Sequence, residues 1–409
     1  MTTPPHRATA EAIASAVAAE RASMVASLIR LTGDWDLAED CVQDAAERAL
    51  MHWPRDGLPR SPAAWLATAA RNRALDVLRR RQTERAKLQQ RAILDERGAD
   101  GSWPPDQPSD DRLRLIFTCC HPALALDGQV ALTLKTVAGL STAEIARAFL
   151  VPEATMSQRL LRTKRRIAGA GIPYQVPPDD LLAERTSGVL AVVYLIFNEG
   201  YSQPGDYLAT EALRLARLMA GLMPGEDEVH GLLALITFQM ARRSTRFDGR
   251  GDLVPMEDQD RSRWDAALIA EGQRELRRAV SAGGPPGPYR LQAQIAACHA
   301  TAADADATAW GTIVALYDAL LAAQPSPVIA LNRAIAIGFR DGYQAGLAAL
   351  DALDPQSLAS YYLVPAARAD FLRRLGHGAQ AREAYLAALA LLPAGEAEQR
   401  LLRRRLAEL

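Results

Sequence analysis

Basic side chains gather in two short stretches of the chain, where their chemistry suits phosphate binding. Residues 71–91 carry eight basic and two acidic side chains, and residues 153–166 carry five and one. Because arginine and lysine pair with phosphate oxygens, a local surplus of this kind indicates a nucleic-acid contact. The whole chain has 47 basic and 48 acidic residues, so its net charge of −1 conceals an uneven distribution. Residues 1–170 hold 24 basic and 20 acidic side chains, and the remainder holds 23 and 28.

Cys119, Cys120 and His121 form a second group of reactive side chains. Adjacent cysteines lack the C-x2-C spacing of a zinc site, so we favour buried packing, with a metal or redox role as the alternative. The other histidines are scattered, with no nucleophile or acid at a spacing that suggests catalysis. We therefore expect no enzymatic activity, no metal and no cofactor.

The composition describes an ordinary globular protein. With 409 residues, 49% hydrophobic and 23% charged, the chain has room for two or three domains with full cores. Four cysteines are too few for a disulfide framework, the N-terminus lacks a signal-peptide pattern, and no apolar run is long enough to span a membrane. We expect a cytoplasmic protein with no membrane partner.

Helical periodicity runs through almost the whole sequence, and the predicted fold class is all-α. Two stretches rich in Gly, Pro and Asp cannot continue a helix and predict linkers at residues 96–110 and 169–180. The predicted domains are therefore residues 8–95, 111–168 and 181–409.

Residues 139–167 have the pattern of a helix-turn-helix motif. Ser141 and Glu144 form a capping box for a first helix, and a second helix is predicted to begin at Glu153 after a short turn. One face of the second helix is apolar and is formed by Met156, Leu160, Thr163 and Ile167. The opposite face is basic and suits a DNA groove. The alternative is an amphipathic helix whose basic face contacts only solvent.

Residues 62–81 predict another helix with two faces. The polar face is formed by Trp65, Asn72, Asp76, Arg79 and Arg80, and the apolar face by Ala67, Ala74, Leu75 and Leu78. Trp65 is either part of the core, the commoner fate of tryptophan, or a platform beside single-stranded bases.

Three motifs carry a family resemblance. The AED..QD helix, the WL..AARN..LD..RRR helix and the helix-turn-helix occur in the order and spacing of the two conserved domains of an extracytoplasmic-function (ECF) sigma factor. The resemblance covers about residues 8–168. It implies two small helical sigma domains, with core RNA polymerase and promoter DNA as partners.

The resemblance also implies roles for individual residues. Those implied to bind core polymerase are Glu39, Asp40, Gln43 and Asp44. Those implied to bind the minus-ten element are Arg60, Ser61, Trp65, Asn72, Arg73, Asp76, Arg79 and Arg80. Those implied to bind the minus-thirty-five element are Ser157, Gln158, Arg159, Arg162, Lys164, Arg165 and Arg166. A stand-alone helix-turn-helix regulator with a protein-interaction domain is the alternative function.

The C-terminal segment resembles the sigma-factor subgroup with a tetratricopeptide-like extension. The best match lies in residues 362–393, where the repeat positions are Ala369, Gly376, Ala381, Tyr385, Ala388 and Pro393. We expect this acidic extension to regulate or support sigma activity in cis, through an intramolecular contact with the basic sigma domains. Residues 242–265 hold six Arg and six acidic residues. They predict a solvated loop with its own ion pairs or, alternatively, a docking surface for the sigma domains.

Overall fold

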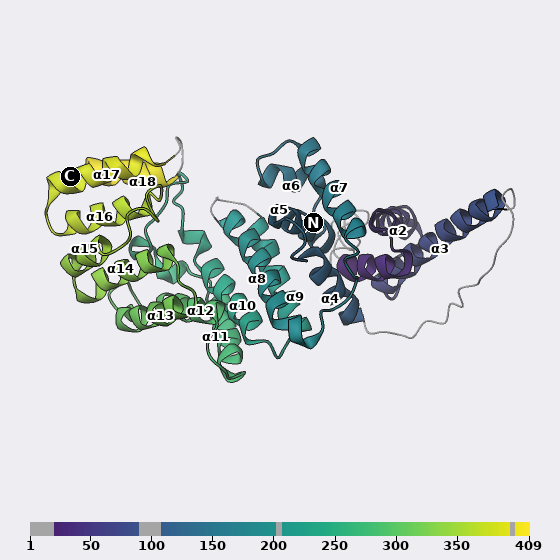
Figure 1. Ribbon diagram of the computed structural model, residues 1–409, viewed down its shortest axis with the longest axis horizontal. Helices are drawn as coiled ribbons and strands as arrows, with labels where there is room; N and C mark the ends of the chain where they lie inside the picture. The colour runs from purple at the N-terminus through teal and green to yellow at the C-terminus, as the bar shows by residue number, and fades with distance from the viewer. Residues whose placement is uncertain (1–19, 90–107, 202–206, 393–396) are drawn as a thin grey trace. The chain divides into compact units, whose positions relative to one another are not determined.

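The chain is built from α-helices, which confirms the predicted fold class (Figure 1). The computed structural model describes residues 20–89, 108–201, 207–392 and 397–409. Within these ranges, β structure is limited to one isolated bridge, and no helix combines the length and apolarity needed to cross a membrane.

The described residues divide into two compact units, 1–195 and 196–409. The helices of the first unit, after helical residues 20–32, are α2 (Trp35–Asp56), α3 (Pro62–Gln89), α4 (Pro108–Cys119), α5 (Leu126–Thr133), the π-helical η1 (Leu134–Ala138), α6 (Thr142–Ala148), α7 (Glu153–Gly169) and most of α8 (Asp179–Tyr201). The division between the units falls inside α8, fifteen residues beyond the predicted boundary at 180. Helix α4 already begins at Pro108, and the rest of the predicted first linker lies outside the described residues.

The helix-turn-helix forms as its local sequence predicts. The side chain of Ser141 accepts a hydrogen bond from the backbone N–H of Glu144 at 3.2 Å, and Glu144 Oε2 accepts one from the N–H of Ser141 at 2.7 Å. These two bonds satisfy amides that the first turn of α6 leaves unpaired. The buried residues of α7 are Met156, Leu160, Thr163 and Ile167, which confirms the predicted apolar face.

Helix α3 packs against α2 through a stripe of small and aliphatic residues. Leu66, Ala70 and Ala74 are fully buried, whereas Ala67 is exposed. The prediction that Ala67 belongs to the apolar face is therefore wrong. The i, i+4 spacing from Leu66 through Ala70 to Ala74 determines which face meets α2.

The second unit continues with helices that pack mainly on their neighbours in the chain (Figure 1, teal to yellow). They are α9 (Leu208–Leu222), α10 (Asp227–Ala241), α11 (Ala266–Ser281), α12 (Pro288–Ala300), α13 (Trp310–Ala323), α14 (Pro327–Asp341), α15 (Tyr343–Asp351), α16 (Leu363–Arg374), α17 (Gly378–Ala390) and α18 (Ala397–Ala407). In the α16–α17 pair, Ala369, Ala381 and Ala388 are completely buried, and Gly376 makes the turn with a φ of 79°. The tetratricopeptide-like interpretation stays a prediction.

A long connection between α10 and α11 forms ion pairs with the C-terminal helices of this unit. We call residues 246–264, which include the short 3-10 helices η3 (Met256–Asp258) and η4 (Arg261–Arg263), the strap. Glu257 pairs with Arg374 of α16, and Asp258 pairs with Arg405 of α18 at 3.1 Å. The solvated loop with its own ion pairs is therefore the wrong prediction, because these partners lie 117 and 147 residues away in the sequence.

Phe371 shows why two glycines are required where three helices meet. Its ring is 1% exposed and lies against Gly338 of α14 and Gly346 of α15. A Cβ atom on Gly338 would lie 2.3 Å from the ring, and one on Gly346 would lie 2.5 Å from it. The two glycines therefore allow an approach that no other residue type permits without movement of the ring or the helices.

We expect Gly338→Ala to lower the free energy of unfolding of the C-terminal unit by about 1–3 kcal/mol, because overpacking forces the ring or the helices apart. Urea unfolding followed by hydrogen exchange in α14 and α16 measures the change. The matched control is Gly311→Ala in α13, where a Cβ meets nothing within 4 Å. That control should be neutral or stabilising by up to about 1 kcal/mol. A Gly338→Ala chain as stable as the Gly311→Ala chain would contradict the packing argument.

Candidate nucleic-acid interface

Helix α7 presents a polar, basic face above its buried stripe. The residues that the sequence assigns to DNA and that are exposed on this helix are Ser157, Gln158, Arg162, Arg165 and Arg166. Arg162 and Arg165 make no ion pair with any described residue, so their charges are available to a partner. With the apolar stripe fixed in the core, this face is the part of α7 that can enter a groove.

The two other basic residues assigned to DNA are occupied within the unit. Arg159 is half-buried, with its Nε 3.1 Å from the carboxylate of Asp127 at the start of α5. Lys164 Nζ lies 2.7 Å from Asp36 and 3.3 Å from Glu39, both on α2. The structure thus joins Lys164, predicted to bind DNA, to Glu39, predicted to bind polymerase.

The contact of Lys164 with α2 is sheltered from solvent. The side chains of Lys164 and Glu39 are each 13% exposed, and Thr136 Oγ1 lies 3.4 Å from Glu39 Oε1. Burial lowers the pKa of Lys164, but the carboxylates of Glu39 and Asp36 outweigh it and hold this pKa above its ordinary value. Lys164 is therefore charged at neutral pH, and the stability that its raised pKa contributes is lost as the pH rises through that pKa, in strongly alkaline solution.

A second buried contact joins α4, through Asp111, to helical residues 20–32. The Asp111 side chain is 2% exposed and accepts hydrogen bonds from Ser27 at 3.1 Å and from Arg30, whose Nε lies 2.9 Å from Oδ1. The Tyr174 hydroxyl lies 3.0 Å from the carbonyl oxygen of Ala26 and 3.3 Å from that of Asp111. The sequence analysis missed this site, because its only sign in the sequence is the pair of acidic residues Asp110 and Asp111 at the end of the predicted linker.

We expect a double-mutant cycle between Lys164→Met and Glu39→Gln to give a coupling energy of about 1 kcal/mol or more, since both groups are largely withdrawn from water. Urea unfolding followed by hydrogen exchange in α2 and α7 measures it. The pair Asp44 and Arg48, 2.8 Å apart on α2, is more exposed than the Lys164–Glu39 pair; it is the control and should give about 0.3–0.5 kcal/mol. Equal coupling in the two cycles would show that the Lys164 contact is only a surface ion pair.

The residues assigned to polymerase binding, three acids and one glutamine, differ in their accessibility. Asp40 and Gln43 are exposed on α2, and Gln43 Nε2 donates to Glu47 at 3.0 Å. Asp44 is half-buried and pairs with Arg48 and with Arg73 of α3, the latter at 3.8 Å. Of the four residues assigned to polymerase binding, only Asp40 and Gln43 are therefore exposed to a partner.

The start of α3 and its polar face carry the residues assigned to the minus-ten element. Those exposed to solvent are Arg60, Ser61, Asn72, Asp76, Arg79 and Arg80. Ser61 Oγ accepts a hydrogen bond of 3.4 Å from the N–H of Ala64 and so caps the helix. Trp65 is half-buried and packs edge-on against the buried Trp53 at 5.4 Å between ring centroids, which supports its reading as part of the core.

The cysteine pair lies in the core, which confirms the packing interpretation. Cys119 and Cys120 are buried, and Cys120 Sγ lies 3.5 Å from Thr133 Oγ1. Burial raises the pKa of Cys120 to about 11 and raises that of Cys119 as well, so both are thiols at neutral pH. Arg185 of α8 donates to the carbonyl of Phe117 at 2.7 Å and so ties α8 to this part of the core.

Comparison with known proteins places these elements in families. The family models that match are Sigma-70 region 2 over residues 17–84, Sigma-70 region 4 over residues 114–167, and a family of unknown function, DUF6596, over residues 185–280. No solved structure matches the chain. The first two families coincide with the α2–α3 pair and with the helix-turn-helix.

Two relatives cover different shares of the chain. An uncharacterised protein of Rhizobium meliloti (strain 1021) is 42% identical over 386 residues, which are 92% of this chain and 91% of that protein. The ECF RNA polymerase sigma factor SigL of Mycobacterium tuberculosis is 33% identical over 138 residues, which are 32% of this chain and 73% of SigL. With the two sigma regions in order and this likeness to SigL, the chain belongs to the ECF RNA polymerase sigma factors.

Proposed function

We propose that this sigma factor binds core RNA polymerase through the exposed part of α2 and reads promoter DNA with α3 and α7. The observation that carries the proposal is the face of α7, where Gln158, Arg162 and Arg165 are exposed directly above a buried apolar stripe. On the exposed surface of α2, Asp40 offers a negative charge and Gln43 a neutral polar group to a basic partner.

The residues of α3 suit the opening of the promoter. Asn72 and Arg79 are exposed on the same helix, where they can contact an unstacked base and its phosphates. Unstacking a base costs a few kcal/mol, which contacts to the flipped base must offset. In this proposal the subunit makes and breaks no covalent bond, and recognition drives strand separation.

Run-off transcription with core polymerase tests the proposal directly. Core polymerase plus this chain should start transcription from a defined set of promoters, and mapping the 5′ ends of the transcripts identifies the minus-ten and minus-thirty-five sequences. Tight binding to duplex DNA without polymerase, together with no initiation, would favour the stand-alone regulator. Neither binding nor initiation would refute both functions.

We also propose that the C-terminal unit controls this activity in cis. A chain ending after Tyr201 keeps α8 complete, including Arg185 and its bond to Phe117, and removes the rest of the extension. Run-off transcription by this shortened chain should differ at least about threefold from that of the full chain. Unchanged output at equal polymerase occupancy would refute regulation in cis.

A further inference from the structure

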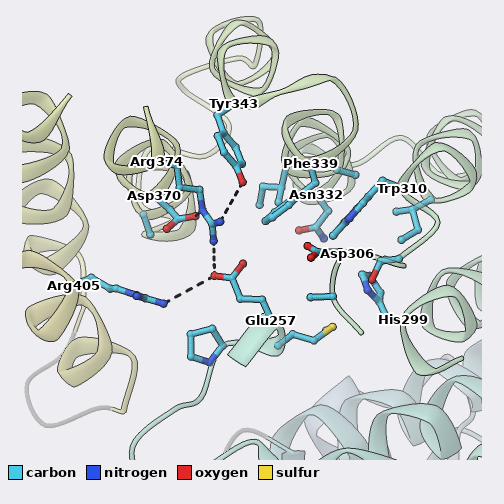
Figure 2. A pocket seen from close by; sticks show the side chains of 18 of the residues that line it. Glu257, His299, Asp306, Trp310, Asn332, Phe339, Tyr343, Asp370, Arg374 and Arg405 are labelled. Carbon is cyan, nitrogen blue, oxygen red and sulfur yellow. Dashed lines mark hydrogen bonds and ion pairs between the residues drawn. The ribbon is translucent and has the colours of Figure 1, made fainter. Parts of the chain in front are cut away.

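The second unit contains a cavity of about 580 Å³ between the strap and the helices from α12 to α18 (Figure 2). Pockets that hold small organic ligands measure about 300–1,000 Å³ and combine apolar walls with a few polar groups. The cavity has this size, and neither sigma region contributes to it. It is therefore a candidate ligand site separate from the DNA-reading surfaces.

One wall of the cavity is a row of aromatic rings. Trp310 stacks on Phe339 with 4.5 Å between centroids and an interplanar angle of 11°, and His299 meets Trp310 edge-on at 5.3 Å. At the other end of the row, the Arg374 guanidinium lies 5.4 Å from the Phe339 centroid and 5.3 Å from that of Tyr343. The wall already holds one cation at one end, which shows that its ring faces suit positive charge.

Of the three arginines that line the cavity, Arg374 and Arg405 have their charges matched by carboxylates, whereas Arg261 is bonded to backbone carbonyl oxygens. Arg374 pairs with Glu257 and, at 2.7 Å, with Asp370, while Arg405 pairs with Asp258 and Glu257. An anionic ligand would have to displace these carboxylates and leave them unpaired, which is costly. The charge balance of this side of the cavity therefore disfavours an anion.

Asp306 provides negative charge on the side of the cavity near Trp310. It is exposed and lines the cavity, and no described residue pairs with its carboxylate (Figure 2). Arg261, which also lines the cavity, is bonded to the carbonyl oxygens of His299 and Ala302 at 2.7 and 3.0 Å. Asp306 is thus an available partner for a cation lying against the aromatic wall.

Two neutral polar groups complete the site. Burial, together with the charges of Arg242 and Arg261, lowers the pKa of His299 to about 4, so its ring adds no positive charge at neutral pH. The half-buried carboxamide of Asn332 has no hydrogen-bond partner among the described residues and offers both a donor and an acceptor.

We propose that this cavity binds a small organic cation, an amine, amidinium or guanidinium group on a flat apolar body. The cation lies between Asp306 and the aromatic wall, and the apolar body fills the space beside Trp310 and Phe339. The same charged group comes either from a free small molecule or from a basic side chain of a peptide. The proposal goes beyond the sigma function and does not depend on it.

Calorimetric titration of the full chain with benzamidine, benzamide and benzoate tests the proposal, because the three probes share a flat ring and differ in charge. We expect benzamidine to bind at least about tenfold more tightly than benzamide, and benzoate to bind no better than benzamide. Equal affinity for the cation and the neutral amide, or tighter binding of the anion, would overturn the proposal.

Two variants locate the site. Asp306→Asn should weaken benzamidine binding about three- to tenfold and leave benzamide binding unchanged, because it removes only the charge. The control is Asp304→Asn in the same loop, where either side chain can accept the 2.8 Å hydrogen bond from the N–H of Ala307. Unchanged benzamidine affinity in Asp306→Asn, confirmed as folded by circular dichroism, would refute the assignment.

Titration with two peptides distinguishes between the two sources of the cation. The pentapeptide Gly-Gly-Arg-Gly-Gly is compared with its citrulline counterpart, which has the same shape without the charge. Tighter binding of benzamidine than of the arginine peptide indicates a free small molecule, and the reverse indicates a peptide side chain. Binding of neither cation at millimolar concentration would overturn the proposal.

Discussion

Replacing Asp40 and Gln43 together by alanine is expected to weaken binding to core RNA polymerase at least about thirtyfold, which is about 2 kcal/mol. Both side chains are exposed on α2, and neither contacts the core of the first unit. The double variant removes one negative charge and one polar side chain from the surface of α2, and it leaves no buried charge unpaired. The amount of polymerase recovered in a pull-down and the yield of run-off transcript should fall together. The urea midpoint of unfolding should equal that of the unchanged chain within experimental error.

The matched control is Asp56→Ala, at the C-terminal end of the same helix. Asp56 is exposed and lies 3.6 Å from His52, outside the motif assigned to polymerase. This variant should bind core polymerase as the unchanged chain does. If the double variant bound polymerase normally, α2 would not be the contact surface; if both variants lost binding, the effect would be one of general acidity.

Arg162→Ala is expected to reduce initiation from promoters with the matching minus-thirty-five element about tenfold, because losing one base contact costs about 1–3 kcal/mol. Gln158→Ala, one turn earlier on the same face, should instead relax the base preference at one position. Binding-site selection with the polymerase complex measures both effects. Arg403→Ala, an exposed arginine on α18, is the control for loss of charge and should change neither quantity.

Lys164 provides a contrast within the same helix. Its side chain is 13% exposed, and its ammonium group is held by Asp36 and Glu39, whereas Arg162 is exposed and makes no ion pair with a described residue. In the arrangement of the described structure, Lys164→Ala should therefore change the contact between α2 and α7 more than it changes promoter sequence preference. A loss of base specificity as large as that of Arg162→Ala would show that Lys164 leaves α2 to bind DNA.

The contact between α2 and α7 bears on how the sigma factor engages its partners. Glu39 and Lys164 were assigned to different partners by their motifs, yet they pair with each other in the structure. A partner that uses Glu39 must displace Lys164 and compensate for the lost ion pair. Comparing polymerase affinity at low and high salt would reveal this competition, because salt weakens the internal pair as well as the intermolecular one.

Local features of the fold were predictable from the sequence alone. The capping box of Ser141 and Glu144 and the buried stripe from Met156 to Ile167 depend on spacings within one helix turn or one helix face. The all-α class and the sigma motifs follow from the same kind of information. Ala67 shows the limit even here, since the exact face of α3 that is buried depends on where α2 packs.

Only the tertiary structure decided which charged residues are free and which are paired. Lys164 and Arg162 look alike in the sequence, but Lys164 meets Glu39 from 125 residues away. Likewise, the charged strap resembles a solvated loop until its carboxylates reach α16 and α18, and the aromatic wall gathers residues from four helices. Helix formation depends on neighbouring residues, whereas the pairing of surface charges depends on which elements pack together, and many alternative partners of equal charge are present in the chain.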